Sequence, residues 1–160
     1  MELSLTFKKD YMIVLNKLFS KVIIPTPILD DENIYDDLGN LEFEEGIFET
    51  NLGYNIFVEL GNSNNNLAKR LSEYDRYIIA IAGEKDILAV SNDNPIRKIC
   101  KKYDIKITGI LGVICSAYEN NIISFEEMSR SLKFLFSPKS SCYLSTKLKN
   151  KIFNYYSVEI

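Results

Sequence analysis

The sequence predicts an α/β domain, a three-layer α/β/α sandwich with a mainly parallel central sheet. Short apolar runs rich in β-branched residues alternate along the chain with amphipathic segments of helical period. The segments between these runs are too long for hairpins, and crossovers of such length join parallel strands. Residues 87–90 form an uninterrupted apolar run, which is typical of a parallel strand covered on both faces.

The N-terminal part of the chain alternates between helix and strand. Its predicted elements are a helix over residues 11–19, a strand over 22–24, a helix over 27–38 and a strand over 55–60. Asp10 is the expected N-cap of the first helix. Pro25 ends the first β-branched run, and Pro27 suits the first turn of the next helix, which Gly39 ends. The run N-I-F-V-E-L predicts the second strand.

The alternation continues to the C-terminus. The predicted elements are a helix over residues 67–82, a strand over 87–90, a helix over 95–103, a strand over 105–108, helices over 111–120 and 125–136, an edge strand over 142–144 and a helix over 147–156. In the first of these helices, apolar residues at three- and four-residue spacings occupy one face. Asn94 with Pro95 is a helix-start signal. Ser124 with Glu127 forms a capping box, and Ser145 is the expected cap of the last helix.

One domain is expected over residues 1–160, because a chain of this length can bury a single core. There is no signal peptide pattern, and the longest apolar run, residues 78–83, is far shorter than the ~20 residues of a membrane span. Three scattered cysteines lack a pairing motif or zinc spacing, so reduced thiols are expected. These observations predict a soluble, cytoplasmic protein without a membrane segment.

The chain contains no histidine. This absence excludes a Ser-His-Asp triad, the H-E-x-x-H zinc helix and any histidine general base. Any catalysis would therefore depend on carboxylates, lysines, tyrosines or a metal ion held by oxygen ligands.

Charge is distributed unevenly along the chain. Residues 1–60 hold 12 acids and 4 bases, residues 61–120 hold 7 acids and 9 bases, and residues 121–160 hold 3 acids and 6 bases. One interpretation is an ordinary solvated surface. The other is a basic C-terminal part that contacts phosphate and an acidic part that holds a cation.

Asp93 lies where the predicted strand 87–90 turns into a helix, the edge at which open α/β sheets bind ligands. A turn-and-cap role alone would also explain an Asp next to Asn94. A magnesium site needs further carboxylates, because Mg²⁺ prefers several oxygen ligands. The other candidate acids are Asp30, Asp31, Glu73 and Asp75. Asp75 occupies an otherwise apolar helix stripe, where a charge needs a cation or a partner such as Arg76 or a lysine.

Four segments in order resemble the PIN-domain family of metal-dependent nucleases, which includes many toxins of toxin–antitoxin pairs. They are K-L-F-S-K-V-I-I-P-T-P-I-L-D-D at 17–31, L-S-E-Y-D-R-Y-I-I-A-I-A at 71–82, I-L-A-V-S-N-D-N-P-I-R-K-I-C-K-K at 87–102 and I-K-I-T-G-I-L-G-V-I at 105–114. Asp31, Glu73, Asp75 and Asp93 stand where the family has acids, although Ser72 replaces the usual glycine. The resemblance covers about residues 3–143 and implies a PIN-like fold.

One departure concerns the start of the domain. The family begins with a strand that ends in D-x-S-x-L-I, whose Asp is a metal ligand, whereas M-E-L-S-L-T-F-K-K is similar to the residues that come after that Asp. Glu2 is a poor substitute at the terminus. Two explanations remain open: a shortened reading frame of an active nuclease, or a degenerate PIN-like fold that no longer cleaves.

The resemblance implies a Mg²⁺- or Mn²⁺-dependent ribonuclease, a hydrolase. Asp31, Asp75 and Asp93 would be its catalytic carboxylates, and these three with Glu73 would bind the metal. Arg97, Lys98, Lys101, Lys102 and Lys106 would contact the RNA backbone, unless they are simply a solvated helix face. The alternative is a non-catalytic module that binds RNA or protein. An antitoxin partner and a homodimer are implied by the resemblance alone.

Overall fold

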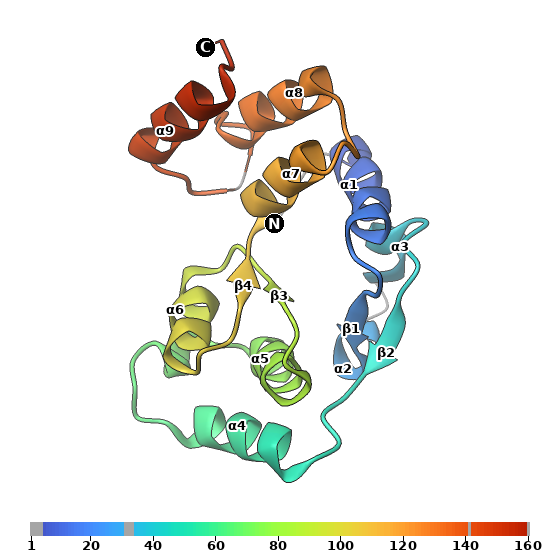
Figure 1. The fold of residues 1–160 in the computed structure, drawn as a ribbon. Helices are drawn as coiled ribbons and strands as arrows, with labels where there is room; N and C mark the ends of the chain where they lie inside the picture. Colours follow the sequence, from blue (N-terminus) through green and yellow to red (C-terminus); the bar gives the residue numbers. More distant parts are fainter. Residues whose placement is uncertain (1–4, 31–33, 141, 160) are drawn as a thin grey trace.

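The computed structural model describes residues 5–30, 34–140 and 142–159 and has the predicted α/β class (Figure 1). The helices are α1 (Leu5–Leu18), α2 (Thr26–Leu29), α3 (Ile34–Leu38), α4 (Asn51–Asn62), α5 (Glu73–Lys85), α6 (Asn94–Lys102), α7 (Ile110–Glu119), α8 (Phe125–Leu135) and α9 (Thr146–Tyr156), with a 3-10 helix η1 (Ala68–Arg70). The strands are β1 (Ile23–Pro25), β2 (Glu44–Gly46), β3 (Ala89–Val90) and β4 (Ile107–Thr108).

The described strands pair in parallel, as the crossover lengths predict. β1 pairs with β2, with Ile23 opposite Glu44, and β3 pairs with β4, with Ala89 opposite Ile107. These pairs form two separate two-stranded sheets within the part of the chain that the structure describes. Helix α5 contacts both β1 and β3, so one helix supports both sheets.

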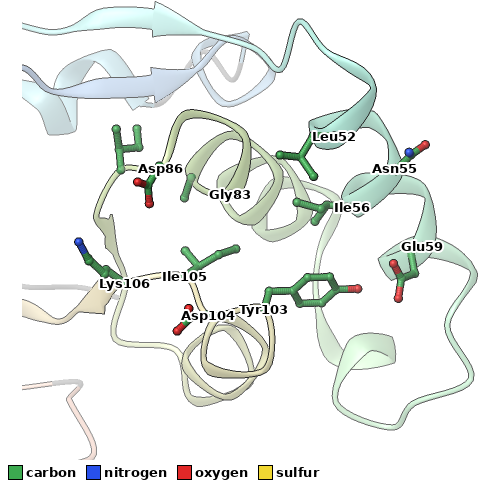
Figure 2. Close-up of a pocket in the computed structure, with 12 residues that line it drawn as sticks. Leu52, Asn55, Ile56, Glu59, Gly83, Asp86, Tyr103, Asp104, Ile105 and Lys106 are labelled. Atoms are coloured by element: carbon green, nitrogen blue, oxygen red, sulfur yellow. The ribbon is translucent and has the colours of Figure 1, made fainter.

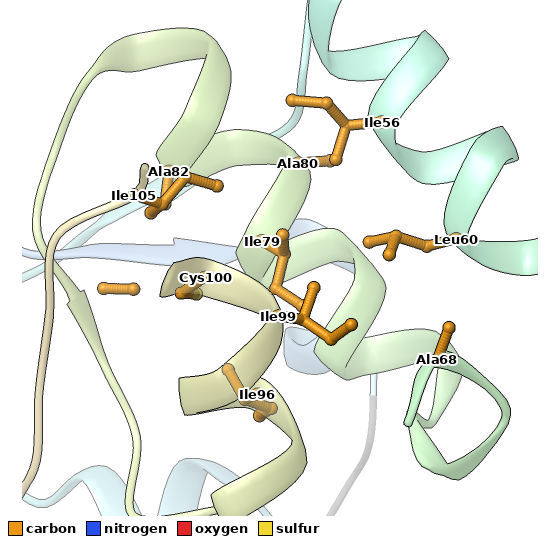
Figure 3. Close-up of a cluster of buried hydrophobic side chains, with 11 residues drawn as sticks. Ile56, Leu60, Ala68, Ile79, Ala80, Ala82, Ile96, Ile99, Cys100 and Ile105 are labelled. Atoms are coloured by element: carbon orange, nitrogen blue, oxygen red, sulfur yellow. The ribbon is translucent and has the colours of Figure 1, made fainter. Parts of the chain in front are cut away.

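The main core surrounds α5. Its residues 79–82 are all buried, because α4 packs on one side of the helix and α6 and the strands on the others. Figure 3 shows Ile79 beside Ile99 of α6, with Leu60 of α4 projecting toward both. A helix that is apolar on nearly every side over one turn is expected only where it is enclosed.

Two smaller cores complete the fold. Ile114, Met128, Leu132 and Phe153 join α7, α8 and α9 into a helical layer at the top of Figure 1. The third core gathers Leu29, Leu38 and Leu41 with partly buried residues of α1 and β1. Each core is built from elements that are close in sequence.

The predicted strand over residues 55–60 is wrong, because these residues belong to helix α4. Gly53, Ile56 and Leu60 are its buried residues, at spacings of three and four that match a helix facing α5. A short apolar run has the composition of both a strand and a buried helix turn, and periodicity over six residues does not separate them.

Four other predictions of local structure are corrected. The predicted helix over 67–82 is divided: η1 comes first, residue 71 is extended, and α5 starts after Ser72. The predicted helix over 27–38 is divided between α2 and α3, although a positive φ of 55° at Gly39 agrees with the predicted stop. Asp10 lies inside α1 and is not its N-cap. Residues 142–144 form no strand, and Tyr143 is fully exposed.

No helix among the described residues is long and apolar enough to cross a membrane.

Candidate functional site

The junction between β3 and α6 is a tight polar turn. The backbone N–H of Ser91 donates to the carbonyl of Thr108 over 2.9 Å, which is the last bond of the β3–β4 ladder. The Ser91 hydroxyl then accepts from the N–H of Asp93 over 3.1 Å. This serine bond turns the chain directly from the strand end into the helix.

Asp93, and not Asn94, is the N-cap residue of α6, yet its side chain makes no capping hydrogen bond. Its backbone carbonyl accepts the first helical bond, from the N–H of Arg97 over 3.1 Å. The side chain is exposed. Helix capping therefore does not engage the Asp93 carboxylate, and this group is available to another ligand.

Asn92 joins this turn to the start of α7. Its Oδ1 accepts from the N–H of Ile110 over 2.9 Å, and its Nδ2 lies 3.7 Å from Sγ of Cys142. A Cβ added to Gly109 would lie 2.4 Å from that Oδ1 and 2.9 Å from Nη1 of Arg97, so both side chains pass close over the glycine. The sequence shows that this stretch is polar, but it does not reveal that Oδ1 of Asn92 bonds to the first residue of α7.

A cavity of about 790 Å³ opens beside the turn. Asn94 and Arg97 of α6 line it, together with the first turn of α7 and the exposed Tyr143. On its far wall the Tyr156 hydroxyl donates to the Glu119 carboxylate. Burial, and then the hydrogen bonds and charges of Glu119 and Cys115, raise the pKa of Tyr156. This tyrosine therefore stays protonated and serves as a structural bridge between α9 and α7.

A shallow groove of about 370 Å³ runs along the outside of α6 and β4. Arg97, Lys98, Lys101 and Lys106 line it with a single acid, Asp104. None of these four bases forms an ion pair with an acid in the described part of the chain. Four of the five predicted bases therefore line one groove, and Lys102 does not. Lysines in the last turn of α6 also offset the helix dipole.

The structure gives Asp75 a local role that the sequence pattern alone did not reveal. Asp75 and Ser72 form a capping box: the N–H of Ser72 donates to Oδ2 of Asp75 over 2.7 Å, and the N–H of Asp75 donates to Oγ of Ser72 over 3.2 Å. The pattern S-x-x-D was the available signal. Glu73 is exposed in the same turn, and Asp31 lies outside the described residues.

A second cavity, of about 340 Å³, lies at the opposite ends of β3 and β4 (Figure 2). Burial, and then the hydrogen bond and charge of Glu59, raise the pKa of Tyr103 to about 12. Figure 2 shows Glu59 beside the Tyr103 ring, and Asp86 and Asp104 on the other side of the cavity. Because α/β sheets bind ligands beyond the carboxyl ends of their strands, this cavity is the weaker candidate.

Comparison with known families identifies the fold. A family model described as a PIN domain matches residues 6–157, nearly the whole chain. The chain belongs to the PIN-domain family. No curated protein and no solved structure matches it. Membership confirms the predicted family and gives the chain a nuclease-type fold.

PIN domains generally use divalent metals, and the donors available here are carboxylates, the ligand type that Mg²⁺ prefers. Within residues 5–30, 34–140 and 142–159, however, no group of three or more acids or cysteines lies close enough together to hold a metal ion. The described residues alone therefore do not complete a metal site in this PIN domain. Glu73, Asp75 and Asp93 are among the described residues and do not form such a group with one another, and the fourth predicted ligand, Asp31, lies outside the described residues.

Proposed function

We propose that this PIN domain is a Mg²⁺- or Mn²⁺-dependent endoribonuclease. Asp31, Asp75 and Asp93 are its catalytic carboxylates, and Glu73 is the fourth metal ligand. The observation that carries the proposal is Asp93, an exposed carboxylate with no capping bond at the carboxyl end of β3. It lies one helical turn from Arg97, which lines the 790 Å³ cavity.

The chain's own residues bind and orient the RNA. Arg97 lines both the 790 Å³ cavity and the shallow groove along α6 and β4. It can therefore hold the phosphate nearest the carboxylates. Lys98 and Lys101 extend this positive surface to the neighbouring phosphates. A bound divalent cation would supply a water of lowered pKa and neutralise charge on the scissile phosphate.

The direct test is cleavage of a labelled single-stranded RNA by the full chain with Mg²⁺ or Mn²⁺, and with EDTA. We expect cleavage only with metal, and at least about a hundredfold loss in Asp93→Asn. Asp86→Asn is the matched control, because Asp86 is also an exposed Asp beside β3, at the opposite end. Cleavage that persists in EDTA, or in Asp93→Asn, would refute the mechanism.

The RNA surface makes a separate prediction. Replacing Arg97, Lys98 and Lys101 with alanine should reduce the slope of log affinity against log salt by about 2, since each lost phosphate contact on a single strand contributes ~0.7. Fluorescence anisotropy with a labelled RNA measures this slope. The control variant replaces three exposed lysines elsewhere, Lys133, Lys139 and Lys147, and should change it little. Equal slopes in the two variants would place the RNA elsewhere.

A second candidate function is RNA binding without cleavage. It is favoured by the capping box, which engages the Asp75 carboxylate, and by the lack of a three-acid group among the described residues. This function predicts that RNA binds with equal affinity with and without Mg²⁺ and is recovered intact. Metal-dependent turnover by the full chain would exclude it.

From the family resemblance we also propose that the protein is the toxin of a toxin–antitoxin pair and forms a homodimer. Light scattering should then give about twice the 18.4 kDa mass of the chain. A monomeric mass across the concentration range would remove the dimer from the proposal.

A further inference from the structure

Tyr143 is a fully exposed tyrosine at the rim of the 790 Å³ cavity beside the β3–α6 turn. The N–H of Leu144 donates to the carbonyl of Cys142 over 3.1 Å, which closes a three-residue turn with Tyr143 at its centre. Cys142 and Leu144 are partly buried and pack against the core that α7, α8 and α9 share. The two neighbours thus anchor this turn to the protein, while the aromatic ring between them remains in water.

A hydrogen bond joins the segment of Tyr143 to the candidate site. Nδ2 of Asn92 lies 3.7 Å from Sγ of Cys142, so the residue before Tyr143 contacts the turn between β3 and α6. Asp93, the N-cap residue of α6, follows directly in that turn. Arg97, one helical turn further on, lines the same cavity as the tyrosine. The exposed ring therefore borders the cavity close to the residues that we propose act on RNA.

The lining of this cavity suits a nucleotide. Among the described residues that line it, Arg97 is the single charged residue, and none is acidic. Its apolar wall includes Ile107, Leu111 and Ile152. Asn94 adds an exposed amide that can both donate and accept hydrogen bonds. A nucleotide has the matching groups: a base with two apolar faces and a polar edge, and a phosphate beside it.

We propose that this cavity receives one unpaired base of the RNA, which stacks on the Tyr143 ring while Arg97 binds the adjoining phosphate. The inference rests on the RNA binding in the proposed function, and it specifies the substrate as RNA that is unpaired at the cavity. A base inside a duplex is stacked and paired, so its faces and edge do not reach the ring. Every base has a π-face, so this contact selects the unpaired state and tolerates different sequences.

An acidic peptide is the competing occupant, since it could also pair with Arg97. The basic surface favours the nucleic acid. Arg97 borders the second groove, in which Lys98, Lys101 and Lys106 continue the positive charge away from the cavity. A polyanion with a phosphate at every residue can use such a surface along its length. The combination of a basic groove with an exposed aromatic ring is typical of proteins that bind single strands.

The test uses the full chain and single strands of about ten uridines, each with one 2-aminopurine at a different position. EDTA is present, so that metal-dependent cleavage does not interfere. We expect 2-aminopurine fluorescence to be quenched most strongly at one position, because stacking on an aromatic ring quenches this base. Tyr143→Ala should remove most of this quenching and weaken binding about tenfold. Tyr143→Phe keeps the ring and should behave like the wild type.

The matched control is Tyr54→Ala, because Tyr54 is an exposed tyrosine on α4 outside the cavity. It should leave quenching and affinity unchanged. A strand without a base at the most quenched position should bind the wild type about tenfold more weakly and should bind Tyr143→Ala no more weakly than the intact strand does. The slope of log affinity against log salt should be the same in the wild type and Tyr143→Ala, since no phosphate contact is lost.

Wild-type quenching and affinity in Tyr143→Ala, or full affinity for the strand that lacks the base, would overturn the inference. Absence of RNA binding would also overturn it and would leave an acidic peptide as the occupant. The proposed nuclease fails by a different result. If Tyr143 supports stacking but no RNA is cleaved with Mg²⁺ or Mn²⁺, the base site stands without the nuclease. If Tyr143→Ala binds and cleaves RNA like the wild type, only the base site is wrong.

Discussion

Asp75→Asn separates two roles that the same carboxylate could have. The asparagine Oδ1 can still accept the N–H of Ser72, which the Asp75 carboxylate now accepts over 2.7 Å, so most of the cap survives. Complete loss of such a cap costs about 1 kcal/mol, which corresponds to a fall of ~2–4 °C in the unfolding midpoint for a chain of this size. We expect Asp75→Asn to lose less than that.

The metal role predicts a much larger effect on function. If Asp75 is a ligand, the variant should lose RNA cleavage by at least about a hundredfold. It should also lose stabilisation by Mg²⁺, which is ~1.4 kcal/mol for a site at ten times its dissociation constant. Thermal unfolding followed by circular dichroism, with and without Mg²⁺, measures this difference independently of cleavage.

The chain contains its own control for this experiment. Ser124 and Glu127 form a second capping box with the same two donor–acceptor distances, 2.7 and 3.2 Å, on α8. Glu127→Gln should therefore match the small stability change and leave cleavage and the Mg²⁺ effect intact. If Asp75→Asn behaves like Glu127→Gln in all three measurements, Asp75 is a capping residue only.

Two further changes test how the fold positions the site. Burial alone would raise the pKa of Glu84, but hydrogen bonds from the side chain of Thr50 and from the N–H groups of Glu49 and Thr50 lower it below 4.5. The stabilisation that the ionised Glu84 carboxylate gives to the start of α4 is therefore complete above the pKa of Glu84 in the unfolded chain, near 4.5. It is lost as the pH falls through the lower pKa of Glu84 in the folded protein. Glu84→Gln should cost about 2 kcal/mol at pH 7 and progressively less at acid pH, measured by urea unfolding; a cost that does not change with pH would contradict this. Gly109→Ala should displace Asn92 and Arg97 and cost about 1–3 kcal/mol in the same assay, with weaker RNA binding by anisotropy; wild-type affinity would contradict the close approach.

Local signals in the sequence were sufficient where one residue type decides the backbone. Ser124 with Glu127, and Ser145, cap α8 and α9 as predicted. Pro95 lies in the first turn of α6, although the cap is Asp93. These features depend on hydrogen bonds within a few residues, so a single sequence contains all the information they need.

The errors arose where contacts distant in sequence decide the structure. Residues 55–60 are helical because Ile56 and Leu60 pack against α5, and a six-residue run does not reveal that partner. Asp75 is anomalous only if the apolar pattern of residues 67–82 belongs to one continuous helix. Once the helix begins after Ser72, the same Asp is at the capping position.

The division into two sheets could not be predicted from local patterns either. The described strands form two sheets with a groove between them. Whether strands join depends on the backbone groups that each edge leaves free. Those groups became visible only when the partners of β1 and β3 were known.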